Sequence, residues 1–194
     1  MSALTDVTRR SLEQYVKPLY AGLDGVQTFD RVDRLRTYVA ALREDPASLS
    51  AAVDDLLLEI LLLLHGAVDR LGSLGAGGRL DLFLKGLGLP EELARTVRTG
   101  LGRFREDPRR PEEELLHDAL LLESAGIVAT VERLMAAGKK KLALGRALAQ
   151  LDPGPAVERY RTPRGAALGA ARRKDAEGWI EDLRRRAAQE GTSA

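Results

Sequence analysis

The sequence predicts an all-α protein, a bundle of about eight to ten helices formed by a single domain over residues 1–194. Apolar residues recur at helical spacing along nearly the whole chain. No segment combines strict alternation with an excess of β-branched residues, so we predict no sheet. Aromatic residues make up only 4% of the chain, so the core must consist mainly of Leu, Ala and Val, and this composition favours helix.

Two helices are expected in the first quarter of the chain. The apolar spacing predicts one over Leu12–Leu23, and Asp24-Gly25 then breaks the pattern. A second is predicted over Asp30–Arg43, with its apolar residues on one face. Asp45-Pro46 ends it, because proline has no N–H to donate and restricts the residue before it.

The third helix is expected to be the buried centre of the fold. It is predicted over about Ala51–Leu71, with Ser48 or Ser50 as its cap. Its segment Leu56–Leu64 is apolar nearly all round, which is typical of a core helix. Nine residues interrupted by Glu59 are too few to span a bilayer.

The remaining helices follow a glycine-rich stretch, residues 72–78, that is predicted to be a loop without a nucleotide-binding Gly-Lys-Ser/Thr motif. Thr162 is expected to cap the last helix, since threonine is favoured at that position. The predicted ranges are 81–86, 90–105, 112–124, 127–137, 141–150 and 163–188.

Charge and cysteine content restrict the class of protein. Thirty basic residues balance twenty-nine acidic ones, so neither nucleic acid nor an anionic membrane is an expected partner. The absence of cysteine excludes disulfides, thiolate zinc sites and cysteine nucleophiles. Residues 1–10 have no apolar core of the kind found in signal peptides. We therefore expect a soluble, cytoplasmic protein.

The chain has two histidines, and their surroundings single them out. A lone histidine beside an apolar run is most often a packing residue. Here His65 closes the most apolar helix, and His117 precedes Asp118 at the start of another apolar run.

Three segments, taken in order, resemble the HD-domain metal phosphohydrolases. Residues 19–32 resemble the segment that carries the family's first metal histidine, which falls at Arg31. The apolar run ending in His65-Gly66 resembles the helix that ends in the His-Asp doublet. Residues 116–127 resemble the segment with the last metal aspartate, here Asp118. The matched positions are separated by 34 and 53 residues, and the resemblance covers about residues 15–188.

The resemblance implies a metal site of two histidines and two aspartates, of which this sequence keeps His65 and Asp118. Arg31 cannot replace a histidine ligand, because a guanidinium stays protonated and has no lone pair to give. Gly66 has no side chain. We therefore expect no bound metal ion or other cofactor, and no confident catalytic residue. A ligand pocket is expected from Gln27, Arg31, His65, Asp69 and Asp118.

One hypothesis concerns charge: Arg31 takes the place of the cation and pairs with Asp118, since a buried carboxylate without a counter-charge is costly. Three functions stay open at this point. The first is an HD-like protein that has lost hydrolase activity and binds a small phosphorylated ligand or a protein partner. The second is an active phosphohydrolase on nucleotides or another phosphoester, with a divalent ion held by His65, Asp118 and a neighbour such as Asp69 or Asp30. The third is a structural or assembly protein.

Overall fold

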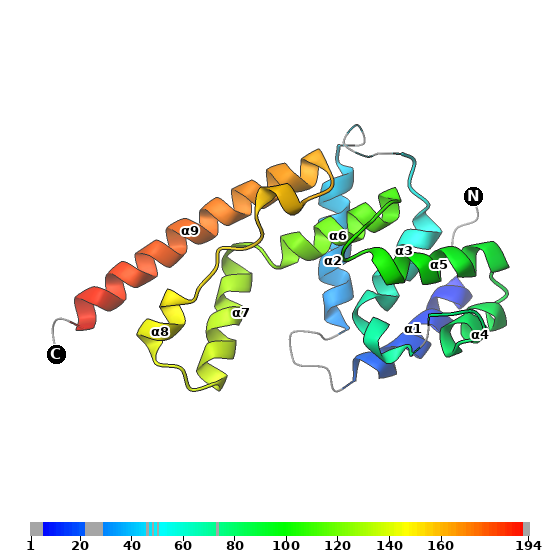
Figure 1. The fold of residues 1–194 in the computed structure, drawn as a ribbon, viewed down its shortest axis with the longest axis horizontal. Helices are drawn as coiled ribbons and strands as arrows, with labels where there is room; N and C mark the ends of the chain where they lie inside the picture. Colours follow the sequence, from blue (N-terminus) through cyan, green and yellow to red (C-terminus); the bar gives the residue numbers. More distant parts are fainter. Residues whose placement is uncertain are drawn as a thin grey trace. The chain divides into compact units, whose positions relative to one another are not determined.

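A computed structural model describes residues 6–21, 29–45, 47, 49, 51–72 and 74–191, and this part of the chain is helical without a strand, as predicted. None of its helices is both long and apolar enough to cross a bilayer. Figure 1 shows the helices with their labels. Their bounds are α1 Asp6–Tyr20, α2 Asp30–Arg43, α3 Asp55–Leu64, η2 His65–Arg70, α4 Arg79–Gly86, α5 Glu91–Arg103, α6 Pro111–Glu123, α7 Gly126–Lys139, α8 Leu144–Ala149, η3 Val157–Arg159 and α9 Pro163–Gly191.

The contacts divide the chain into two compact units, residues 1–117 and 118–194, and the division falls inside α6. In the first unit α3 contacts α1, α2 and α5, which places it at the centre. Seven of its ten residues are buried, which confirms it as the core helix. The expectation of one domain over the whole chain stays a prediction.

The predicted third helix is shorter than expected at both ends. It begins at Asp55, because the side chain of Asp54 accepts hydrogen bonds from the N–H groups of Leu56 and Leu57. The predicted cap at Ser48 or Ser50 is therefore wrong for this helix, and both serines lie outside the described residues.

Regular α-helix ends at Leu64 because the side chains of His65 and Tyr20 bind the backbone groups that would form the next helical hydrogen bond. The Nδ1 atom of His65 donates to the carbonyl oxygen of Leu62, which would otherwise accept from the N–H of Gly66. That N–H donates instead to the hydroxyl of Tyr20. The chain continues from His65 to Arg70 as a tighter 3₁₀ turn.

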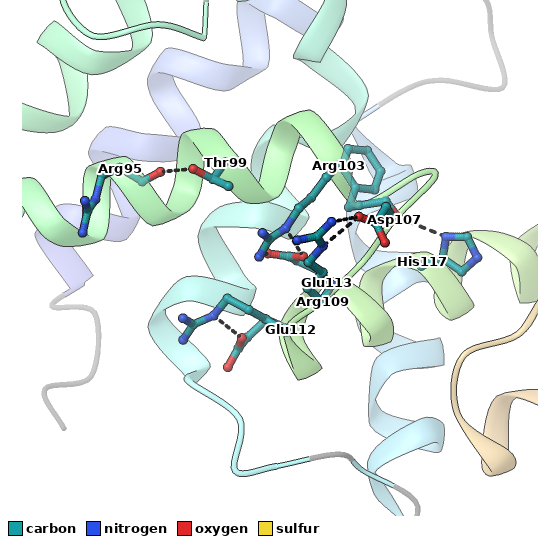
Figure 2. A network of polar contacts seen from close by, with 10 residues as sticks. Arg95, Thr99, Arg103, Asp107, Arg109, Glu112, Glu113 and His117 are labelled. Carbon is teal, nitrogen blue, oxygen red and sulfur yellow. Dashed lines mark hydrogen bonds and ion pairs between the residues drawn. The ribbon is translucent and has the colours of Figure 1, made fainter.

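A buried ion pair joins α5 to α6 within the first unit (Figure 2). Both oxygens of Glu113 accept hydrogen bonds from Arg103, each at 2.7 Å, and the N–H of Arg109 donates to one of them at 2.9 Å. Glu113 is fully buried, so its charge depends on these donors. The predicted helix over 112–124 is confirmed by α6, and this carboxylate fixes its first turn.

In the second unit α7, α8 and α9 contact one another. Leu148, Leu151 and Ile180 form its buried cluster, and Trp179 packs against them. The hydroxyl of Thr162 accepts from the N–H of Gly165 at 2.9 Å, so Thr162 caps α9 as predicted. The helix runs to Gly191, three residues beyond the expected end at 188.

The Arg103–Glu113 pair yields a stability prediction. Arg103→Gln leaves a buried carboxylate without its cation and should lower the free energy of unfolding by about 3 kcal/mol in urea titrations. The matched control is Arg95→Gln on the same helix, which breaks an exposed pair with Glu92 and should cost less than about 0.5 kcal/mol. Equal losses in the two variants would contradict this role for Glu113.

Candidate functional site

His65 is buried at the end of α3, and its hydrogen bond fixes which ring nitrogen carries the proton. Nδ1 lies 2.7 Å from the carbonyl oxygen of Leu62. A carbonyl only accepts, so Nδ1 carries the hydrogen, and the neutral ring keeps its lone pair on Nε2. Nε2 is buried and has no hydrogen-bond partner within the described part of the chain. It is therefore a buried acceptor that no described residue satisfies.

Burial lowers the pKa of His65 to about 4. The hydrogen bond to Leu62 acts in the opposite direction, and the positive charges of Arg31 and Arg105 lower the pKa further. The imidazole is therefore neutral at pH 7.

Tyr20 fills the space beside Gly66, at the second position of the doublet. Its hydroxyl donates to the carbonyl oxygen of Leu63 at 3.2 Å and accepts from the N–H of Gly66 at 3.1 Å. A β-carbon on residue 66 would lie 2.7 Å from the Tyr20 ring and hydroxyl, well inside van der Waals contact. Position 66 therefore has no side chain that could bind a metal ion, and Tyr20 occupies the space that such a side chain would need.

Arg105 borders the same turn from the segment after α5. One of its nitrogens donates to the carbonyl oxygen of His65 at 3.5 Å, and another lies 4.0 Å from a carboxylate oxygen of Asp69. The Asp69 side chain is 83% exposed, so Asp69 lies at the surface beside Arg105. Asp30, in the first turn of α2, is also exposed.

Asp118 is fully buried, and its two oxygens hold the start of α9. One oxygen accepts from the N–H of Arg161 at 2.8 Å. The other accepts from the N–H of Thr162 at 2.8 Å and from its hydroxyl at 2.7 Å. A β-carbon at Gly165 would lie 2.3 Å from the second oxygen, so the helix approaches closely because that residue is glycine.

Among the predicted residues, Arg31 acts electrostatically on His65, and the structure adds two residues that contact the same turn, Tyr20 and Arg105, which the sequence did not single out. Gln27 lies outside the described residues. Asp118 belongs to the second unit, so its membership of one pocket with His65, and its pairing with Arg31, stay predictions.

The described donors around His65 do not suit a divalent ion. Among the described residues there is no group of three or more His, Asp or Glu side chains that could hold a metal ion. Structural and catalytic sites use at least three protein donors for zinc, and calcium takes six or more oxygens. The positive charges of Arg31 and Arg105 both act on His65, and like charges repel a cation.

No protein-family model matches the chain, and no curated protein sequence matches it. Solved structures do. Bacillus subtilis YpgQ in complex with ADP is similar with a TM-score of 0.64 and 17% identity, over 92% of this chain and 94% of YpgQ. A Lactobacillus plantarum protein is similar with a TM-score of 0.67 and 14% identity, over 96% of this chain and all of that one (100%). The chain shares their fold. At such low identity the likeness concerns the fold alone.

The contact between Tyr20 and Gly66 predicts an asymmetric effect of adding a methyl group. Gly66→Ala should destabilise the protein by about 1–3 kcal/mol, because the ring and its two hydrogen bonds must shift. Gly138→Ala on α7, where the new methyl meets no atom within 4 Å, should be neutral or slightly stabilising. Denaturant unfolding of both variants measures the difference, and a harmless Gly66→Ala would show that Tyr20 does not restrict this position.

The low pKa of His65 predicts a loss of stability in mild acid. Below pH 6.5 the unfolded chain binds a proton at this residue, whereas the folded chain does so only near pH 4. The contribution is therefore fully present above pH 6.5 and falls by about 3 kcal/mol towards pH 4. Urea unfolding at pH 7.5, 6 and 5 should show a steeper decline for the wild type than for His65→Asn. Parallel declines would contradict the neutral, buried imidazole.

Proposed function

We propose that this protein is an HD-like ligand-binding protein that takes a small phosphorylated molecule of the nucleoside diphosphate type beside His65, without metal-dependent hydrolysis. The observation that carries the proposal is Arg105, which donates to the carbonyl oxygen of the buried His65 at 3.5 Å, and the positive charge of Arg31 acts on the same imidazole. In the family that the sequence resembles, this part of the fold holds a cation. Here the fixed cations belong to the protein, so an anion is the complementary ligand.

Guanidinium groups suit phosphate because their planar N–H groups match two phosphate oxygens at once. Arg105 is half-exposed, which leaves part of its side chain accessible to a ligand from solvent. Its contact with Asp69 is long, at 4.0 Å, and exposed, so a phosphate dianion would compete with it successfully.

His65 would contribute a different contact. Because Nδ1 is held by Leu62, Nε2 accepts a hydrogen bond and does not donate one. The ligand that satisfies both kinds of group carries an anion and a hydrogen-bond donor, such as a hydroxyl or an amino group. A nucleotide has both. The fold supports this class of ligand, since YpgQ, a protein of the same fold, was crystallised with ADP.

Hydrolysis of the bound phosphate has little support in these residues. Metal-assisted hydrolysis needs an ion that polarises the phosphoryl oxygen and lowers the pKa of a bound water, and the donors here do not suit such an ion. A histidine with a pKa of about 4 is also a weak general base at neutral pH.

The test is calorimetric titration of the wild type with ADP, adenosine and pyrophosphate in the presence of a metal chelator. We expect ADP to bind most tightly, because only ADP has both phosphates and donors. Arg31→Gln and Arg105→Gln should each weaken ADP binding about tenfold or more, the value of a charge-assisted hydrogen bond. Arg95→Gln, which breaks an exposed ion pair with Glu92 on α5, is the matched control and should bind as the wild type does.

Two results would contradict the proposal, and they point to different alternatives. Phosphate release from ADP or another phosphoester that requires added Mn²⁺ or Mg²⁺ and is lost in His65→Asn would favour an active phosphohydrolase. Absence of binding by every phosphorylated compound, with the protein folded, would favour a structural role.

A further inference from the structure

The exposed face of α7 is unusually apolar for a surface helix. Val128 is 68% exposed and Met135 is 62% exposed, with Ile127 and Val131 beside them. The opposite face, which includes the buried residues Ala129 and Thr130, belongs to the side that packs in the second unit. Large exposed apolar side chains that cluster in this way mark an interaction surface. We call Val128, Val131 and Met135 the α7 stripe.

The spacing of the α7 stripe matches a helix that pairs with another helix. Its members stand at i, i+3 and i+7, and Gly138 follows at i+10, which is the seam of a two-heptad coiled coil. Ile127 borders the stripe on one edge. Glu132 and Lys139 border it on the other edge, at the flanking positions that form ion pairs between helices.

The charges on that edge form no ion pair with the described residues. No ion pair in the described part of the structure involves Glu132 or Lys139. The two cannot pair with each other, because seven residues separate them by about 10 Å along the helix axis. An apolar stripe flanked by one acid and one base, two turns apart and neither in an ion pair with a described residue, is complementary to a copy of itself running in the opposite direction.

We propose that this face pairs with a second copy of the chain through an antiparallel contact of two α7 helices. A two-fold axis that passes between Met135 and Ala136 places Glu132 of each copy opposite Lys139 of the other. The contact therefore contains two such ion pairs. The two Met135 side chains meet beside the axis. The same patch serves both copies, as in most homodimers.

The charge pattern also determines the relative direction of the two α7 helices. In a parallel pair, the edge with Glu132 faces the partner's other edge, where Ile127 and Leu134 stand and no charge is available. Only the antiparallel arrangement brings like edges together and neutralises both ions. The contact involves one short helix from each copy, so the dimer belongs to the weak, concentration-dependent class. This inference is independent of the proposed function, since none of these residues belongs to the ligand site.

Sedimentation velocity of the full chain from about 1 to about 500 µM tests the proposal. The wild type should shift reversibly from monomer to dimer with concentration. Met135→Glu should stay monomeric over the range. Leu82→Glu, which charges an exposed leucine on α4, should dimerise as the wild type does. A wild type that is monomeric at every concentration overturns the proposal, as does a dimer that Met135→Glu leaves intact.

Charge reversal tests the direction and register. Glu132→Lys and Lys139→Glu should each weaken the dimer at least tenfold, because each places like charges opposite one another twice. An equimolar mixture of the two variants should associate again, since every pair then has opposite charges. The double variant should also recover. If neither the mixture nor the double variant recovers, the antiparallel register is wrong.

Cross-linking supplies a readout that does not depend on affinity. The chain has no cysteine, so a single new one reports one position. Met135→Cys should form a dimer through a disulfide under mild oxidation, since the two side chains meet at the axis. Leu82→Cys, equally exposed, is the control and should remain monomeric. Equal cross-linking of the two variants contradicts the proposed axis.

Discussion

The hydroxyl of Tyr20 is the contact on which the candidate site depends. It bridges α1 to the end of α3 by donating to Leu63 and accepting from Gly66, across 43 and 46 residues of sequence. By taking the N–H of Gly66, it frees the carbonyl oxygen of Leu62 for the ring of His65. The orientation of the imidazole, its tautomer and the buried lone pair on Nε2 all follow from this exchange of partners.

Local pattern was enough to predict most of the fold. The unbroken apolar run before His65 has no polar face to offer solvent, so its burial in α3 follows from the sequence itself. Thr162 before a proline predicts a helix start for the same local reason. Helix ends were less predictable. We expected Ser48 or Ser50 to cap the third helix, but the cap is Asp54. A tyrosine far away in sequence helps to end α3 in a 3₁₀ turn.

The site was predicted only in part because its contacts are not local. Arg31 and His65 were found through a resemblance of motifs. No sequence pattern marks Tyr20 or Arg105 as a site residue, since a tyrosine near a helix end and an arginine in a charged loop are both common. The partners of Asp118 lie 43 and 44 residues further along the chain. No spacing rule shows that this carboxylate anchors the turn before α9.

The close fit between Tyr20 and Gly66 restricts which single substitutions the protein tolerates at these two positions. A carboxylate at position 66 would need a smaller residue at position 20 as well, and each change alone is unfavourable: the first creates a collision, and the second leaves a void and two unsatisfied backbone groups. A path of single substitutions towards an acidic residue at position 66 therefore passes through a destabilised intermediate.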